Sequence, residues 1–117
     1  MALHQVALFV KDLDASVAFY AGVLGAEPAS QEDTWVVFDT GGASLGLHAI
    51  PPHIADEIAV SVPPEPREDS PVKLVLAMAA TDDLAARVEA LGVVVLRRGW
   101  GGVDYTDVEG NVFTTMA

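Results

Sequence analysis

Residues 3–25, LHQVALFVKDLDASVAFYAGVLG, predict one strand followed at once by one helix. We expect the strand over residues 3–10, where apolar side chains occupy both faces. Asp12 or Asp14 is the expected N-cap of the helix, because a short carboxylate accepts hydrogen bonds from the free amides of the first turn. Gly25 is the expected left-handed C-cap. The expected apolar stripe of this helix consists of Val17, Tyr20, Ala21 and Leu24.

Three short strands are expected after this helix, around residues 27–30, 35–39 and 44–50. The last two are separated by Thr40-Gly41-Gly42, a turn sequence typical of a hairpin. The first fifty residues therefore predict a module with the order strand, helix, strand, strand, strand.

Residues 51–71 interrupt this pattern and predict a linker. They hold six of the seven prolines of the chain, together with five acidic residues. Proline has no amide hydrogen, so this composition disfavours regular structure. Residues 54–62 fit either a short edge strand or a turn of helix, and the sequence leaves both open.

The second half of the chain repeats the order of the first. A strand is expected over residues 72–79, and a helix begins at Thr81 and ends at Gly92. Leu84, Val88 and Leu91 form the expected apolar face of this helix. The strands that follow are expected over residues 93–97, 103–107 and 112–116.

This duplication predicts the fold class. Both helices end in similar phrases, Val-Leu-Gly at 23–25 and Ala-Leu-Gly at 90–92. A repeat of this length indicates an α+β protein built from two βαβββ modules. We expect a single domain over residues 1–117, with the modules at 1–50 and 72–117 on either side of the linker 51–71.

Composition excludes several classes of function. The chain has 117 residues and no cysteine, which excludes disulfides, thiolate metal sites and a cysteine nucleophile. The N-terminus has no signal-peptide pattern, so a cytoplasmic location is expected. The net charge of −11 disfavours nucleic acid and anionic membranes as partners, and it favours cationic small molecules. Acidity that serves only solubility is the alternative.

Two phrases resemble a known family. Residues 4–13, HQVALFVKDL, with SVAFY at 16–20, are similar to the opening of many vicinal oxygen chelate proteins, the glyoxalase, bleomycin resistance and extradiol dioxygenase group. Residues 105–113, YTDVEGNVF, resemble the terminal hairpin of that family, which usually reads Asp-Pro-Asp-Gly-Asn. Val108 and Glu109 depart from it. The resemblance implies curved sheets that form a cup around a ligand.

The resemblance also implies four metal-ligand positions, on the first and fourth strands of each module. In family enzymes, His and Glu at these positions hold Zn, Ni, Mn or Fe. Carried over, the positions fall on His4, Gly46, Lys73 and Thr114, of which only His4 suits a metal. His48 faces the same side as Gly46 but lies roughly 6–7 Å further along the strand. We therefore expect no cofactor, with His4 and His48 as weak metal candidates; a displaced site that adds Asp104 stays open.

The cup implied by the resemblance supplies the expected ligand-binding residues. Its polar side chains are His4, His48, Lys73 and Thr114, and Lys73 has a salt bridge to an acid as its alternative role. Trp35, Trp100, Tyr105 and Phe113 are the aromatic candidates around it, with core packing as their alternative. Trp100 lies between glycines in a turn, which favours an exposed ring.

Three functions fit this sequence. The expected one is metal-independent binding of a small aromatic or drug-like molecule, as in bleomycin resistance proteins, by a homodimer. The alternative is a metal-dependent enzyme of the glyoxalase or dioxygenase type with a rearranged site. The third is an accessory domain whose cup holds nothing. Whether the protein is an enzyme stays open.

Overall fold

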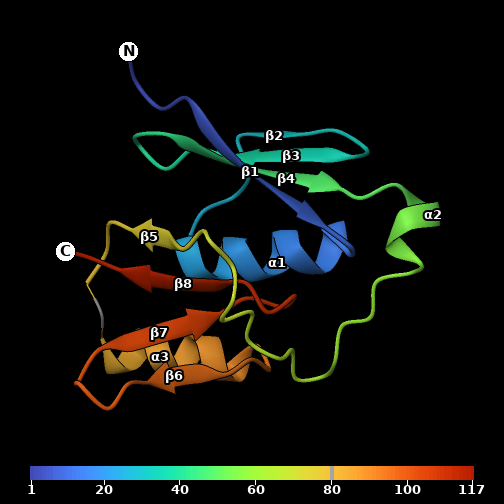
Figure 1. The fold of residues 1–117 in the computed structure, drawn as a ribbon. Coiled ribbons are helices and arrows are strands. Elements are labelled where there is room, and N and C mark those ends of the chain that lie inside the picture. Colours follow the sequence, from blue (N-terminus) through green and yellow to red (C-terminus); the bar gives the residue numbers. More distant parts are fainter. Residues whose placement is uncertain (80) are drawn as a thin grey trace. The chain divides into compact units, whose positions relative to one another are not determined.

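The computed structural model describes residues 1–79 and 81–117. The chain divides into two compact units, unit 1 (Met1–Ala59) and unit 2 (Val60–Ala117), which are described one at a time. In Figure 1, unit 1 runs from blue to green and unit 2 from green to red. Each unit contains one four-stranded mixed sheet, so the predicted α+β class with two repeated modules is confirmed.

Unit 1 has the predicted order of elements. These are β1 (Gln5–Val10), α1 (Leu13–Leu24), β2 (Ser30–Gln31), β3 (Trp35–Phe38) and β4 (Ser44–Ala49). The sheet order is β1-β4-β3-β2, with β1 parallel to β4 and the other neighbours antiparallel. The predicted hairpin turn between β3 and β4 is confirmed.

Both predicted caps of α1 are confirmed. Of the two candidates for the N-cap, Asp12 takes the role, and its carboxylate accepts a hydrogen bond of 3.1 Å from the amide of Ala15. Gly25 ends the helix at φ 64°, in the left-handed region, and its amide donates to the carbonyl of Ala21.

The predicted apolar stripe of α1 is partly wrong. The buried residues are Ser16, Phe19, Tyr20 and Val23, whereas the stripe was expected on Val17, Tyr20, Ala21 and Leu24. This helix is apolar on nearly every side, so the spacing of apolar residues did not single out the face that packs against the sheet. Val17 and Ala21 lie half-buried on a second apolar face.

The sheet of unit 1 has one buried face and one open face. Side chains alternate along a strand, and the buried set includes Val10, Val36, Phe38, Leu45 and Leu47. The residues between them, among them Phe9 and Trp35, form the open face and are far more exposed. Helix α1 packs against β4 on the buried side.

The proline-rich segment begins with a helical turn, α2 (Pro52–Ala55), which decides between the two alternatives for this region. Within the part of the chain that the structure describes, residues 54–62 contain no strand. The ammonium of Lys11 donates to the backbone carbonyls of Ala55, at 3.0 Å, and Ile58. These contacts fasten α2 to the residue that follows β1.

Unit 2 repeats the topology of unit 1. Its elements are β5 (Leu74–Leu76), α3 (Asp82–Ala90), β6 (Val95–Arg97), β7 (Val103–Thr106) and β8 (Val112–Thr115). The sheet order is β5-β8-β7-β6, again with the first strand parallel to the last. Thr81 caps α3 as predicted, with its hydroxyl accepting from the amide of Leu84 at 3.0 Å. Among the described residues, no helix is long and apolar enough to cross a membrane.

Candidate functional site

The open face of unit 1 carries a row of three rings. His48 on β4 is paired in register with Trp35 on β3 and with Phe9 on β1. The His48 ring stacks on Trp35 at a centroid distance of 4.9 Å, and it lies 5.3 Å from Phe9. Phe9 is 66% exposed and Trp35 is 37% exposed. These three residues, called the aromatic row below, leave a ring surface accessible on three adjacent strands.

Gly46 lies next to the aromatic row and is closely covered by two side chains. A Cβ atom at this position would lie 2.7 Å from Oε1 of Gln5 and 3.2 Å from Nε1 of Trp35. The amide of Gln5 is held in place by donating to the hydroxyl of Ser44 at 3.2 Å. The lack of a side chain at Gly46 therefore lets Gln5 and Trp35 approach the backbone of β4.

His4 does not occupy the position that was expected for it. The strand begins at Gln5, and His4 is exposed just before it, with its backbone carbonyl accepting from the amide of Ser44 at 3.0 Å. Alternation assigns position 4 to the face of Val10, and Gln5 is the residue beside Gly46. Counting back in twos from Val10 gives this parity once Val10 is known to be buried, but apolar residues on both faces of the strand hide that in the sequence.

The strand register of unit 2 also indicates that Gln5, and not His4, is the residue of β1 that belongs with Gly46. In unit 1 Ala7 pairs with Gly46, and in unit 2 Val75 pairs with Thr114. Lys73 lies two residues before Val75, as Gln5 lies two residues before Ala7. The four positions that the repeat makes equivalent are therefore Gln5, Gly46, Lys73 and Thr114.

A cluster of ion pairs covers the corresponding face of unit 2. Nζ of Lys73 lies 3.0 Å from Oδ2 of Asp104, and Nε of Arg98 lies 3.0 Å from the same oxygen. The guanidinium of Arg98 also binds both carboxylate oxygens of Glu68, at 2.7 and 2.8 Å. The cluster confirms the alternative that Lys73 forms a salt bridge to an acid.

These contacts keep Asp104 ionised although its residue is only 3% exposed. Burial alone would raise the pKa of this carboxyl, but the hydrogen bonds from Lys73 and Arg98 outweigh burial and lower it. The pKa of Glu68 is lowered as well, mainly by its hydrogen bond to Arg98, and that of Arg98 is raised by both carboxylates. The hydroxyl of Thr114 donates to the carbonyl of Val103 at 3.0 Å.

Tyr105, an expected ligand-binding residue, lies in the core of unit 2. It is 1% exposed and stacks on Phe113 at a centroid distance of 5.3 Å, with an interplanar angle of 23°. Its neighbour Asp104 belongs to the face that carries the ion pairs, so alternation turns Tyr105 to the other face. The expectation that Tyr105 binds the ligand is corrected accordingly, and core packing holds for Phe113 as well.

Trp100 is exposed, as expected from its glycine-rich turn. Its residue is 79% exposed, in a turn closed by the amide of Arg98 donating to the carbonyl of Gly102 at 2.8 Å. A Cβ atom at Gly102 would lie 1.9 Å from the indole ring. The ring therefore rests directly on the backbone of Gly102, in a position that only glycine permits.

The donor set does not fit the divalent metal that the family enzymes hold. Gly46 offers no side chain, protonated Lys73 offers no lone pair, and Gln5 and Thr114 offer only neutral oxygens. Oδ2 of Asp104 is already engaged by Lys73 and Arg98. Across residues 1–79 and 81–117, no three His, Cys, Asp or Glu residues are grouped as metal ligands would be.

Comparison with models of protein families identifies the superfamily of this chain. Residues 2–114 match the model of the Glyoxalase/Bleomycin resistance protein/Dioxygenase superfamily. The chain belongs to this superfamily. No curated protein sequence matches it significantly.

Solved structures of this superfamily resemble the chain over nearly its whole length. A glyoxalase/bleomycin resistance protein/dioxygenase family enzyme from Burkholderia phytofirmans has a TM-score of 0.71 at 20% identity, with 100% of both chains covered. A lactoylglutathione lyase from Agrobacterium tumefaciens has a TM-score of 0.58 at 28% identity, covering 96% of this chain and 90% of its own. A bleomycin resistance determinant encoded on the transposon Tn5 has a TM-score of 0.57 at 18% identity, covering 97% and 94%. The superfamily neighbours thus include both an enzyme and a resistance protein.

Proposed function

We propose that this superfamily member binds a small aromatic or drug-like molecule without the help of a metal. The observation that carries the proposal is the aromatic row of Phe9, His48 and Trp35 on the open face of unit 1. Exposed rings on adjacent strands offer a flat apolar surface on which an aromatic ligand can stack. Tyr105 is left out of the proposed site because it is buried.

The lack of a suitable donor set supports the metal-independent form of this proposal. Three of the four equivalent positions carry groups that bind metals poorly or not at all, and the fourth is a glycine. We expect tag-free protein to contain much less than one metal ion per chain by elemental analysis, and titration with Ni, Zn, Mn or Fe to show no saturable site. One tightly bound ion per chain would favour the metal-dependent enzyme instead.

Unit 2 carries a second candidate surface of its own, the face with the ion pairs. The side chain of Lys73 is 46% exposed, and its ammonium pairs with Asp104 at 3.0 Å. An ammonium donates to carbonyl or carboxylate oxygens, so a ligand with an oxygen-bearing ring suits this face. The net charge of −11 favours ligands that also carry a basic group.

A fluorescence titration tests the proposal. A library of bleomycin-type, anthracycline and other polyketide compounds is added to the protein while tryptophan emission is followed. We expect the binders to be aromatic and neutral or basic, and to quench Trp35. The Trp35→Leu variant should bind at least about tenfold more weakly, which corresponds to about 1.4 kcal/mol. Trp100→Leu is the matched control for Trp35→Leu, because it removes an exposed indole that lies outside the aromatic row.

Two outcomes of this titration would count against the proposal. One is the absence of any saturable quenching across the library, which would favour the accessory role. The other is an equal loss of affinity in both tryptophan variants, which would show that the aromatic row is not the site.

A further inference from the structure

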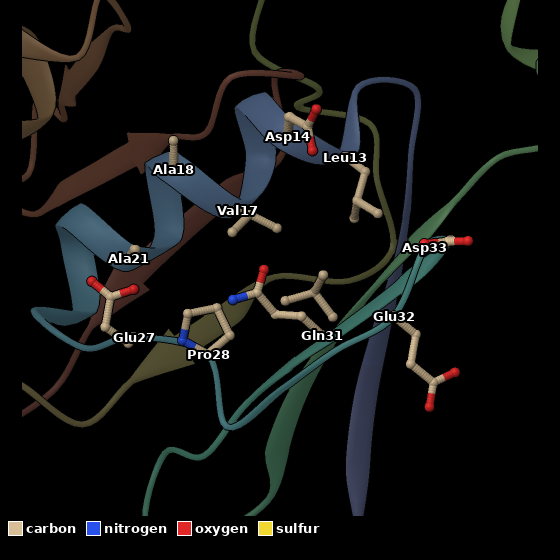
Figure 2. Close-up of a pocket in the computed structure, with 11 residues that line it drawn as sticks. Leu13, Asp14, Val17, Ala18, Ala21, Glu27, Pro28, Gln31, Glu32 and Asp33 are labelled. Carbon is tan, nitrogen blue, oxygen red and sulfur yellow. The ribbon is translucent and has the colours of Figure 1, made fainter.

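A groove of about 660 Å³ lies in unit 1 between α1 and the segment that carries β2. Its apolar lining comes from α1, from the segment before β2 and from β3, and it consists of Leu13, Val17, Ala18, Ala21, Pro28 and Val36. Figure 2 shows Leu13 and Val17 pointing from the helix toward the strands, and the amide of Gln31 reaching into the space between them. A volume of this size matches sites for small organic molecules.

This groove is separate from the aromatic row. Val36 is 3% exposed and belongs to the helix side of the sheet, whereas Trp35, its neighbour in β3, belongs to the open face. The two surfaces therefore lie on opposite sides of one sheet. A ligand in the groove cannot stack on Trp35, so binding at the two places can be measured separately.

The charges around the groove all have one sign. Asp14, Glu27, Glu32 and Asp33 contribute to its lining, and Figure 2 shows them at its rim, with Glu32 and Asp33 turned outward. In the part of the chain that the structure describes, no salt bridge is found for these four carboxylates. Residues 1–59 hold eight acidic residues against a single Lys or Arg, Lys11. The ammonium of Lys11 donates to two backbone carbonyls next to α2.

We propose that this groove binds small organic cations that carry a protonated amine on an apolar or aromatic body. The apolar lining takes the body, and the surrounding carboxylates attract the ammonium. The same charges repel anionic ligands.

The test compares three probes of similar shape: phenethylammonium, phenethyl alcohol and phenylpropionate. Binding is followed by the NMR shifts of methyl groups in Leu13, Val17 and Ala21, at low and at high ionic strength. At low ionic strength we expect the ammonium to bind at least about tenfold more tightly than the alcohol. The carboxylate should bind more weakly than either. High ionic strength should reduce the preference for the ammonium, because salt screens charges at the surface.

Two double variants with the same change in charge locate the effect. Glu27→Gln with Asp33→Asn should weaken phenethylammonium binding several-fold and leave the alcohol unchanged. Asp56→Asn with Glu57→Gln removes two exposed carboxylates that do not line the groove, and it should have little effect on either probe. Val17→Trp should block the groove for all three probes, and circular dichroism shows whether each variant is folded.

Several results would overturn the proposal. Equal affinity for the three probes would show that charge does not select the ligand, and equal losses in the two double variants would show that only net charge matters. Shifts of the ring protons of Phe9 and His48, with none in the methyl groups of the groove, would place the probe on the open face instead. A dimer that dissociates in the Val17→Trp variant would show that a second copy covers the groove. The comparison of the two double variants does not depend on whether Trp35 binds an aromatic ligand.

Discussion

Gly46 has two neighbours that a side chain would displace. A Cβ atom there would lie within 2.7 Å of Oε1 of Gln5, closer than real Cβ contacts allow, and the indole of Trp35 limits movement on the other side. Gly46 is buried, and the rings beside it form the proposed ligand surface. The backbone of a single residue thus decides how Gln5 and Trp35 are arranged.

We predict that Gly46→Ala lowers the free energy of unfolding by about 1 kcal/mol, because the end of the Gln5 side chain must move and its hydrogen bond to Ser44 is lost. Urea denaturation followed by tryptophan emission measures it, and the native spectrum should change as Trp35 moves. Gly42→Ala is the control, because a Cβ atom at Gly42 would meet no other atom within 4 Å. Equal stability of the two variants would contradict the packing described for Gly46.

At the scale of helices and strands, most of the fold could be predicted, because the cap residues and turn sequences agreed with the repeated order of elements. Asp12, Gly25 and Thr81 are caps whose chemistry depends on adjacent residues only, and the structure confirms all three. Strands were less predictable at their ends: β2 was expected over residues 27–30 and is found at Ser30–Gln31. A strand ends where its partner stops pairing, and the partner is distant in sequence.

The candidate site was less predictable than the fold. His4 was carried over from the family resemblance because a histidine suits a metal, and it lies one residue away from Gln5, which is on the face of Gly46. Tyr105 was misassigned because an aromatic residue on a strand fits the core and a ligand site equally well. The pairing of Arg98 with Glu68 joins residues 30 positions apart, and nothing local in the sequence indicates it.

The ion-pair cluster joins β7 to the residues before β5 and after β6. Its carboxylates make the stability of unit 2 depend on pH. Because the pKa of Asp104 is lowered in the folded chain, its stabilising contribution is complete above the usual aspartate value of about pH 4. The contribution decreases as the pH falls below that value toward the folded-state pKa. We predict that Asp104→Asn lowers the free energy of unfolding by about 1–3 kcal/mol at neutral pH, since it removes the charged hydrogen-bond acceptor that Lys73 and Arg98 share, while Arg98 keeps Glu68.

The difference in the free energy of unfolding between Asp104→Asn and the unaltered protein should become smaller in acid, as measured by denaturation at a series of pH values. Asp69→Asn serves as the matched change at an exposed position. A difference that stays constant from neutral pH down into the acid range would show that the ionised form of Asp104 is not what stabilises the unit.

At the scale of the whole molecule, exposed apolar side chains predict association. Leu3, Phe9, Val75, Trp100 and Met116 are each more than half exposed. Large apolar side chains that stay exposed on a small protein are often covered by a partner or a ligand. We expect a homodimer at micromolar concentration, measured by light scattering after gel filtration. A monomer under these conditions would contradict the expectation.

The central claim is that the aromatic row binds an aromatic ligand without a metal. The most direct measurement is a calorimetric titration of the strongest binder from the library, with and without a chelator, for the unaltered protein and for Trp35→Leu. The account predicts the same affinity in the chelator and in its absence, and a loss of at least about tenfold in the variant. Loss of binding in the chelator, with recovery when Zn or Ni is added back in excess, would contradict it.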